Sequence, residues 1–265
     1  MFSKFHLVTK YLKYYLTASN GKGHGIHSPF VFEFITKVLN DKEHYPVYDT
    51  IETLRKKMLV DKTIVNIEDL GAGSAVDKTD QRRIASIAKN SVKSKKFGQL
   101  LFRIVKKYQP DSILEIGTSL GITTSYLSMA NAGVKIITLE GAKSLADKAS
   151  SNFKLLNLSN IQLAEGNFDQ TLPSTIQSLP SIDFAFIDGN HRKEPTIQYF
   201  NSILRKINNF SIIVLDDIHW SREMEEAWDH CKNHETVTLS IDLFFMGLLF
   251  FRKEIKEKQH FTIRF

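Results

Sequence analysis

The chain has 265 residues, of which 42% are hydrophobic and 24% are charged, and its formal net charge is +6. Such a composition is typical of a folded globular protein and argues against long disordered tails. The longest apolar run, residues 243–251, is far shorter than the roughly 20 residues that a membrane-spanning helix needs. Cys231 is the single cysteine, which excludes an internal disulfide and favours a reducing compartment. We therefore expect a cytoplasmic protein without a membrane partner.

The first hundred residues have mainly helical patterns. We expect helices at residues 11–16, 28–39 and 49–59, and one further helical stretch from 81 to 108. Ser28 and Pro29 form a good N-cap and first-position pair for the second of these helices. We interpret residues 1–94 as a helical cap that covers the substrate. His27 is a candidate to lie near the substrate when this segment closes, and a role in starting the helix is an equal alternative.

From residue 112 onward, short β-branched runs alternate with amphipathic stretches of helical length. The expected strands cover residues 112–116, 134–140, 161–165, 182–188 and 211–216. The expected helices cover residues 123–132, 142–156, 171–177, 193–207 and 221–233. This alternation is typical of a parallel sheet with helices on both faces, so residues 95–265 are predicted to form a doubly wound α/β domain.

The end of the chain adds an antiparallel element. Residues 237–242 and 248–252 are predicted to form two strands joined by a bend at Met246 and Gly247. Because a parallel return needs a crossover of about a dozen residues, so short a connection makes these two strands antiparallel. We expect a mostly parallel, seven-stranded sheet with an antiparallel last strand, and residues 261–265 suit one more edge strand.

The first expected strand of the sheet runs into a glycine-rich turn, Gly117-Thr118-Ser119-Leu120-Gly121, and then into a helix. Glycine suits both ends of this turn because the backbone bends sharply there and passes close to a ligand. The spacing differs from the G-x-G-x-x-G of pyrophosphate binders, and the Lys-Ser/Thr pair of a phosphate loop is missing. We therefore expect a ligand without a pyrophosphate, whose ammonium group Glu115 reaches directly or through water.

The second expected strand ends in an acidic residue, Glu140, which Gly141 follows. An acidic group about 20 residues after a glycine turn accepts hydrogen bonds from both hydroxyls of a ribose. The alternative is an exposed carboxylate at the end of a strand. Together and in this order, the glycine turn and Glu140 favour a ligand that carries adenosine.

Five motifs follow one another in this part of the chain: E-I-G-T-S-L-G from Glu115, L-E-G to Gly141, A-E-G-N-F to Phe168, F-I-D-G-N-H to His191, and V-L-D-D to Asp217. With the antiparallel strand pair, they resemble class I S-adenosylmethionine-dependent methyltransferases, in particular the catechol and caffeoyl-coenzyme A O-methyltransferase-like branch. The resemblance covers residues 95–253 and implies S-adenosylmethionine as the cofactor.

The resemblance also implies which residues hold the cofactor. Glu115, Gly117 and Gly121 would hold the methionine part, Glu140 the ribose, and Gly166, Asn167 and Phe168 the edge and face of the adenine. Thr118, Ser119, Gly141 and Asp188 are further candidates for cofactor binding. For Phe168, ordinary packing under a loop is an equally good explanation.

Polar residues also follow the fourth and fifth expected strands, in the segments Asp188-Gly189-Asn190-His191 and Asp216-Asp217-Ile218-His219. Ligands of doubly wound sheets bind outside the carboxyl ends of the strands, so we expect these residues beside the methyl donor. Three carboxylates and two imidazoles at one place are costly without a cation or a role in proton transfer. The predicted reaction is transfer of a methyl group to a small-molecule hydroxyl. No nucleophile triad is visible, and none is needed, because the sulfonium is already an activated donor.

Two roles are open for these residues. In the first, Asp188, Asp216 and Asp217 bind Mg²⁺ or another divalent cation, which acidifies the substrate hydroxyl. The resembled branch has Asp, Asp and Asn at these positions, so Asp217 departs from its pattern. In the second, His191 is the general base and Asp188 is a catalytic residue beside it. The branch has a catalytic lysine where His191 stands, and a helix-capping histidine is the structural alternative.

Other functions stay open on further features. A second acidic glycine loop, Asp69–Ser74, has no acidic strand end at the right distance, and we assign it to the cap. A basic cluster before the first motif would suit an RNA or protein methyltransferase. It consists of Lys89, Lys93, Lys95, Lys96, Arg103, Lys106 and Lys107. Nucleic acid is not favoured, because the Asn/Asp-Pro-Pro-aromatic motif of adenine amine methyltransferases is missing. A non-catalytic or NAD-binding Rossmann-like module is a further alternative.

Overall fold

The computed structural model describes residues 1–67 and 80–265, so the Asp69–Ser74 loop lies outside the described residues. The chain forms two compact units. Residues 1–41 combine with residues 180–265 in one, which we call the terminal unit, and residues 42–179 form the other, the central unit. Within the described ranges, no helix is long and apolar enough to span a bilayer.

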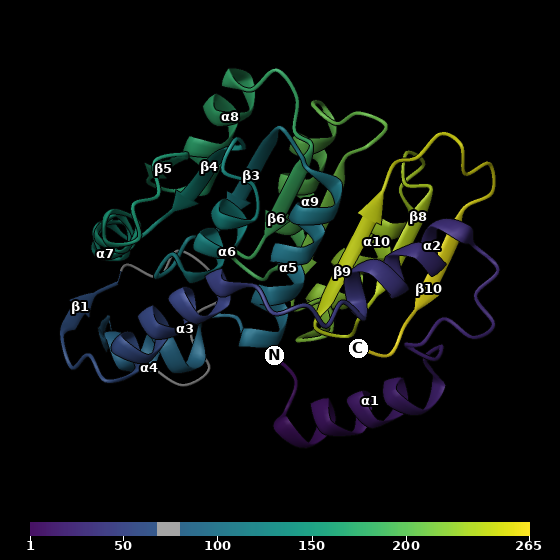
Figure 1. Ribbon diagram of the computed structural model, residues 1–265, viewed down its shortest axis with the longest axis horizontal. Helices are drawn as coiled ribbons and strands as arrows, with labels where there is room; N and C mark the ends of the chain where they lie inside the picture. Colours follow the sequence, from purple (N-terminus) through teal and green to yellow (C-terminus); the bar gives the residue numbers. More distant parts are fainter. Residues whose placement is uncertain (68–79) are drawn as a thin grey trace. The chain divides into compact units, whose positions relative to one another are not determined.

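The central unit contains three parallel strands, β3 (Ser112–Ile116), β4 (Lys135–Glu140) and β5 (Ile161–Glu165), in the order β3-β4-β5 (Figure 1). Every residue of β3 is buried, as are all of β4 but the first, which suits their isoleucine-rich sequences. Helices α6 (Ile122–Ala130) and α7 (Lys143–Leu155) connect these strands, and α8 (Phe168–Ser178) follows β5. Each parallel step therefore has the helical crossover that the sequence predicts.

The first part of the central unit differs from its prediction. It comprises α3 (Pro46–Leu59), β1 (Ile64–Asn66), β2 (Gln81–Arg83), α4 (Ile84–Asn90) and α5 (Lys95–Tyr108). The helical stretch predicted from 81 to 108 is confirmed over most of its length, but it is divided into two helices, α4 and α5. Its first three residues pair with β1 as an antiparallel strand, and Ser94, whose backbone is extended with ψ 155°, is the N-cap of α5.

The terminal unit contains helices from both ends of the chain: α1 (Lys4–Thr17), α2 (Pro29–Phe34), the π-helix η1 (Ile35–Leu39), α9 (Lys193–Leu204) and α10 (Arg222–Asn233). Its strands are β6 (Phe184–Ile187), β7 (Ile212–Asp216), β8 (Leu239–Asp242), β9 (Met246–Phe250) and β10 (Gln259–Thr262), in the order β10-β8-β9-β7-β6. Strand β9 is antiparallel to both β7 and β8, whereas β6 is parallel to β7. The predicted α/β class with an antiparallel strand pair at the end is confirmed, and β10 is the extra edge strand.

The turn between β8 and β9 comes three residues earlier than predicted. Met246 and Gly247 do not form the bend but lie inside β9, and the turn is made at residues 243–245. There the Phe244 N–H donates to Asp242 Oδ1 (2.8 Å), and Phe244 has a left-handed backbone with φ 69°. Gly247 serves packing, because a Cβ on it would lie 2.5 Å from the buried ring of Trp228.

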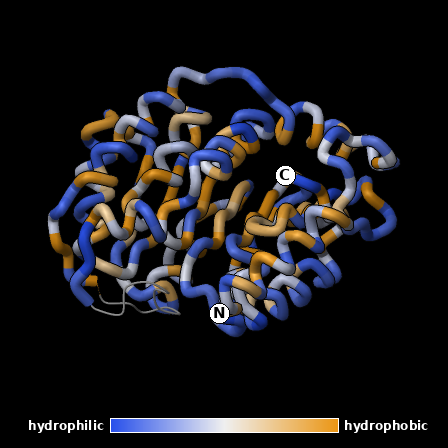
Figure 2. Tube along the Cα trace, turned by 90° about the horizontal axis from the view of Figure 1, so that it is seen from below, coloured by the Kyte–Doolittle hydropathy of each residue, from blue (hydrophilic) through white to orange (hydrophobic). Residues whose placement is uncertain are grey.

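Most of the helices are amphipathic, with hydrophobic residues on the face that packs against the rest of the protein. In Figure 2 hydrophobic and hydrophilic residues alternate along the outer helices, as amphipathic helices require. Helix α5 is an example: Leu100, Leu101 and Ile104 are fully buried, while Lys106 and Lys107 are exposed. Burial of this kind holds each helix against the strands of its unit and fixes the strand ends, where the candidate site residues lie.

Candidate functional site

The glycine turn and the acidic strand end of the central unit lie side by side. In the register of β3 and β4, Ile116 is opposite Leu139, so Gly117 and Glu140 are the next residues at the same edge of the sheet. The N–H groups of Gly117 and Thr118 both donate to the carbonyl of Leu139, at 3.0 and 3.1 Å. The turn after β3 is thus held directly against the end of β4.

Glu140 holds the two loops together with its carboxylate. Its Oε2 accepts a hydrogen bond from the N–H of Ser119 (2.7 Å), and its Oε1 accepts one from the N–H of Ala142 (2.9 Å). The residue is only 7% exposed. Two backbone donors fix its orientation, and each oxygen of a carboxylate can accept a further hydrogen bond, as two ribose hydroxyls would require.

A hydrogen-bonded group of three threonines holds Glu115 in place, and the sequence did not predict this group. It consists of Thr118, Thr124 and Thr138. Glu115 is fully buried, and its Oε2 accepts hydrogen bonds from the hydroxyls of Thr124 (2.5 Å) and Thr138 (2.6 Å). Thr118 in turn lies 2.6 Å from Thr138, oxygen to oxygen, and donates to the carbonyl of Leu139. The hydroxyl of Thr118 is therefore used inside the protein. Thr138 could have been recognised as a polar residue within the apolar strand Lys135–Glu140.

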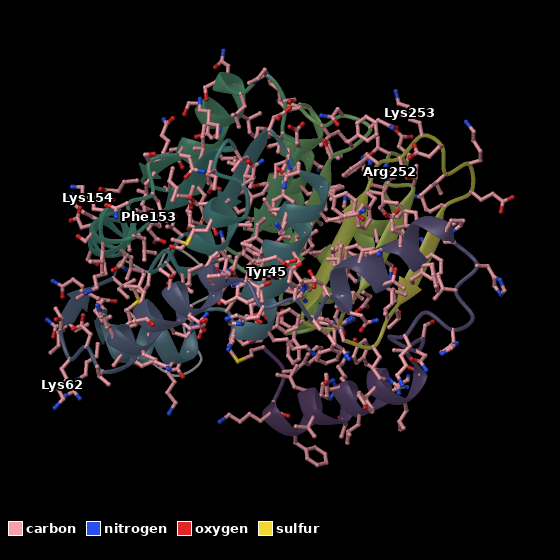
Figure 3. The ribbon with its side chains drawn as sticks, viewed as in Figure 1. Tyr45, Lys62, Phe153, Lys154, Arg252 and Lys253 are labelled. Carbon is pink, nitrogen blue, oxygen red and sulfur yellow. The ribbon has the colours of Figure 1, made fainter. Side chains whose placement is uncertain are left out.

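The glycine at the end of the turn is required by its backbone and by its neighbours. Gly121 has φ 76°, and a Cβ on it would lie 2.5 Å from Cε1 of Phe153, a buried residue of α7 that is labelled in Figure 3. Just before it, the Oγ atom of Ser119 is buried and has no hydrogen-bond partner among the described residues. A buried hydroxyl of this kind fits a polar ligand at the turn.

The third strand end of the central unit carries the residues expected at the adenine. The N–H of Gly166, which has φ 132°, donates to the carbonyl of Glu140 (2.9 Å), so the loop after β5 is joined to the end of β4. Asn167 is the N-cap of α8 and accepts from the N–H of Asp169 (2.9 Å), and Phe168 is half-buried as the first residue of that helix. Gly141 follows Glu140 and is half-buried.

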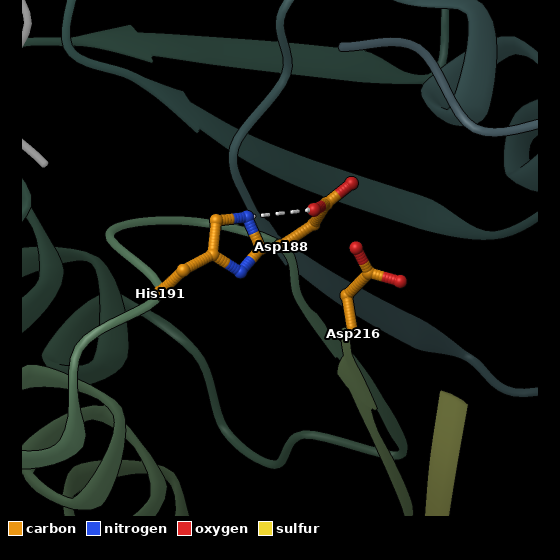
Figure 4. Close-up of side chains that lie close together, drawn as sticks. All are labelled: Asp188, His191 and Asp216. Atoms are coloured by element: carbon orange, nitrogen blue, oxygen red, sulfur yellow. Dashed lines mark ion pairs between the residues drawn. The ribbon is translucent and has the colours of Figure 1, made fainter. Parts of the chain in front are cut away.

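A separate cluster lies at the carboxyl ends of β6 and β7 in the terminal unit. One ligand atom from each of Asp188, His191 and Asp216 lies within 4.8 Å of the other two, and the three side chains point toward one another (Figure 4). His191 Nε2 is 3.4 Å from Asp188 Oδ1, and Asp216 is fully buried. Asp217, expected as a third carboxylate ligand, is not part of this group, and His191 stands in it instead.

The backbone around this cluster is strained. Asn190, His191 and Asp217 have left-handed backbones, with φ of 69°, 46° and 52°. Such conformations cost roughly 1 kcal/mol or more each in residues other than glycine and collect at functional sites. Asn190 Oδ1 is buried without a hydrogen-bond partner in the described part of the chain, while its amide donates to the hydroxyl of Tyr199. The strain and the buried oxygen both indicate a ligand site.

Three residues after Asp216 in the chain, His219 lies between two acidic side chains. Its Nδ1 is 2.8 Å from Glu225 Oε1, and its Nε2 is 2.8 Å from Asp242 Oδ2. Burial alone would lower the pKa of His219, but the hydrogen bonds and charges of Asp242 and Glu225 outweigh it and raise the pKa above its ordinary value. Lys10 of α1 also binds Glu225, at 2.6 and 2.7 Å. His219 therefore acts as part of a structural charge network.

Parallel strands with helical crossovers, one antiparallel strand between β7 and β8, and polar residues at the carboxyl ends of the strands define a Rossmann-like α/β protein of the methyltransferase kind. Residues 114–218 match the family model described as a methyltransferase domain. The chain therefore carries a methyltransferase domain, and the expected resemblance to that class of enzymes is confirmed.

Known proteins are similar to this chain in sequence or in fold. An uncharacterized protein of Acanthamoeba polyphaga mimivirus is 27% identical over 169 residues, which span 56% of this chain and 76% of the viral protein. The solved structure of an S-adenosylhomocysteine-bound methyltransferase of Podospora anserina has a TM-score of 0.60 at 13% identity and covers 85% of this chain and 97% of its own. An O-methyltransferase from Bacillus cereus, in complex with S-adenosylhomocysteine, has a TM-score of 0.55 at 19% identity and covers 83% and 97%. Both structures share the fold of this chain.

Proposed function

We propose that the protein is an S-adenosylmethionine-dependent O-methyltransferase that acts on the hydroxyl of a small molecule. One observation carries the proposal: the glycine turn after β3 and the buried Glu140 after β4 lie at one sheet edge and are joined by the Ser119 N–H. This is the arrangement that an adenosyl ligand without a pyrophosphate requires. The S-adenosylhomocysteine in the two similar solved structures, one of them an O-methyltransferase, supports it.

Several candidate site residues of the central unit have a proposed role in binding the cofactor. Glu140 binds the ribose hydroxyls, and Glu115, held by the threonines Thr124 and Thr138, binds the ammonium group of the methionine part. Ser119, with its buried hydroxyl, is a further contact at the turn. The loop after β5 contacts the adenine through Gly166 and the half-buried Phe168. The cofactor supplies an activated methyl group, so the protein's work is to orient the acceptor and to exclude water.

In the terminal unit, His191 is proposed to take the proton of the acceptor hydroxyl. An imidazole suits this role near neutral pH. Asp188, 3.4 Å from His191 Nε2, orients the ring, and the left-handed backbone at residues 190 and 191 holds the histidine in this position. Asp216 adds a fully buried carboxylate to the same place, where Asp188 is half-buried.

A divalent cation at Asp188, His191 and Asp216 is the second candidate role for this cluster. The three ligand atoms lie close enough together to share one ion. Two carboxylate oxygens and one imidazole nitrogen fit a cation such as Mn²⁺ or Zn²⁺ better than Mg²⁺, which prefers oxygen ligands alone. A bound cation would lower the pKa of a coordinated acceptor hydroxyl. The donor set thus fits a metal, with His191 in the place that we first expected Asp217 to take.

Calorimetry with S-adenosylhomocysteine tests the proposed cofactor. The wild-type protein should bind it with micromolar affinity, and Glu140→Gln should bind at least about tenfold more weakly, because a hydrogen bond to a charged acceptor contributes about 1.5–3 kcal/mol. Glu165→Gln is the matched control, since Glu165 is opposite Glu140 in the next strand but is exposed. Absence of binding by the wild-type protein would refute the proposal.

The role of the cluster is tested by titrating Mn²⁺ into the protein and by assaying methyl transfer from labelled S-adenosylmethionine to a panel of catechols and other small hydroxyl compounds. If a cation binds there, Asp188→Asn and His191→Ala should each lose Mn²⁺ binding, and chelation should stop transfer. If His191 is the base alone, transfer should survive chelation and fall about a hundredfold in His191→Ala. Asp217→Asn is the control for the position outside the cluster and should change neither result strongly.

A further inference from the structure

One helix of the terminal unit has an apolar face that no part of the described chain covers. Helix α1 (purple in Figure 1) exposes Phe5, Val8, Leu12 and Leu16, which are 79%, 56%, 54% and 78% exposed. Their spacing of three and four residues places them in one stripe along the helix. Six of the 13 exposed large hydrophobic residues of the described chain lie within residues 1–16, so the feature is concentrated here. Exposed apolar surface of this extent marks an interaction site.

The opposite face of α1 is fixed to the terminal unit, so the stripe is held outward. The hydroxyl of the buried Tyr14 donates to the carbonyl of Ile263 (2.5 Å) and accepts from the N–H of Phe265 (3.1 Å). Lys10 forms its ion pair with Glu225, and the ring of Tyr11 packs edge-on against Phe244 at 5.1 Å. The stripe therefore cannot be buried by rolling the helix without breaking all of these contacts.

The positive charges of α1 indicate which kind of partner can cover the apolar stripe. The helix contains Lys4, Lys10 and Lys13 and no acidic residue. Lys10 faces inward to Glu225, whereas Lys4 and Lys13 are exposed and fall on opposite sides of the stripe at 3.6 residues per turn. A second copy would bring two identical cationic helices together without a counter-charge. An anionic lipid surface supplies both an apolar layer for the stripe and negative charge for the lysines.

We propose that α1 docks the protein on the surface of an anionic lipid bilayer, in contrast to our expectation from the sequence of no membrane partner. The helix lies in the interface, with Phe5, Val8, Leu12 and Leu16 in the outer acyl region and Lys4 and Lys13 at the headgroups. The segment just before α1 contacts the loop that follows β7: the N–H of Phe2 donates to the carbonyl of Trp220 (3.1 Å), whose ring is 5.8 Å from that of His191. Docking would thus bring the Asp188–His191–Asp216 cluster to the bilayer surface, where an apolar hydroxyl compound could be taken up.

Vesicle co-sedimentation of the full-length protein tests the proposal. The probes are vesicles of phosphatidylcholine alone and vesicles with about 30 mol% phosphatidylserine, at low and physiological salt. The wild-type protein should bind the anionic vesicles at least about tenfold more tightly than the neutral ones, and salt should weaken this preference. A wild-type protein that stays in the supernatant with both vesicles would overturn the proposal.

Two pairs of variants separate the apolar and the charged contributions. Leu12→Gln with Leu16→Gln should lower vesicle binding about tenfold or more, because it removes two inserting side chains. The matched control, Val60→Gln with Leu155→Gln, removes equally exposed residues of the central unit and should bind like the wild type. Lys4→Gln with Lys13→Gln should lose about tenfold on anionic vesicles only. Its control is Lys62→Gln with Lys154→Gln, whose side chains point outward in Figure 3.

Circular dichroism melting identifies variants that fail to fold, and these would be replaced by single substitutions. If a folded Leu12→Gln, Leu16→Gln protein bound vesicles like the wild type, the proposal would be wrong. Light scattering tests the alternative that a second copy of the chain covers the stripe. If the wild type is a dimer and the Leu12→Gln, Leu16→Gln protein is a monomer, a second copy covers the stripe and lipid docking is overturned.

Discussion

At the scale of single residues, the sites depend on a few positions where the backbone leaves little choice. Gly121 has φ 76°, and a Cβ there would lie 2.5 Å from Phe153 Cε1 and 3.2 Å from Ala149 Cβ. Two separate costs would therefore add, because a left-handed backbone disfavours a side chain and because the packed core has no room for one. The glycine ends the turn that holds Glu140, so the same residue serves the fold and the site.

Gly121→Ala should lower the free energy of unfolding by about 2–4 kcal/mol and weaken S-adenosylhomocysteine binding. Urea denaturation and calorimetry measure the two effects. Gly133→Ala is the matched control, because its nearest neighbour would be Asn131 Oδ1 at 3.5 Å and its φ is not left-handed; its change should stay within about 0.5 kcal/mol. Equal losses in the two variants would show that the crowding at Phe153 is relieved by movement.

Residue types at strand ends could be predicted from the sequence, but their partners could not. Asp188 and Asp216 were expected together because parallel strands end at one edge, and the structure places them in one group. Which third side chain joins them depends on the turn after each strand. A left-handed backbone at Asn190 and His191 brings the imidazole to Asp188, while Asp217 has its N–H bonded to the carbonyl of Phe245. Such turns leave no periodic signal in the sequence.

At the scale of the elements, hydrophobic periodicity predicted every strand of the mostly parallel sheet, because buried strands and amphipathic helices have different repeats. It failed where a short segment pairs with a distant one. Gln81–Arg83 continues a helical pattern but forms β2 against Ile64–Asn66, and Gly247 marks contact with Trp228 where a bend was expected. Pairing and packing of this kind are decided by residues far away in the sequence.

The attachment of α1 through the His219 network should depend on pH. Because the pKa of His219 is raised in the folded protein, the protonated ring stabilises the fold below the ordinary pKa of about 6.5, and this contribution is lost as the pH rises through the folded value. Above it, the neutral ring has one N–H to offer to two carboxylates, Glu225 and Asp242.

His219→Gln should therefore destabilise the protein more at pH 6 than at pH 9, by about 2 kcal/mol at the lower pH. Urea denaturation of wild type and variant at both values measures this difference. His230→Gln is a control, because His230 is an exposed residue of α10. A loss that is the same at both pH values would mean that the ring is neutral and acts only by packing.

At the scale of the whole molecule, the first and the last parts of the chain belong to the same compact unit. We expected residues 1–94 to form a substrate-covering cap, and that role stays a prediction. The compact units join residues 1–41 to residues 180–265, and residues 42–94 belong to the central unit. The association has a physical basis in the core, since Phe34 is fully buried and its ring lies 6.0 Å from that of Phe250 in β9.

If the N-terminal residues are part of this core, Phe34→Ala should lower the free energy of unfolding by about 3–5 kcal/mol, as deletion of a buried aromatic ring does. Amide hydrogen exchange should then show faster opening of β8 and β9, although these strands are more than 200 residues away in the sequence. Phe32→Ala is the matched control on the same helix, because Phe32 is 48% exposed, and it should change stability by less than about 1 kcal/mol. Unchanged protection of β9 in Phe34→Ala would mean that residues 1–41 open independently, as a removable cap would.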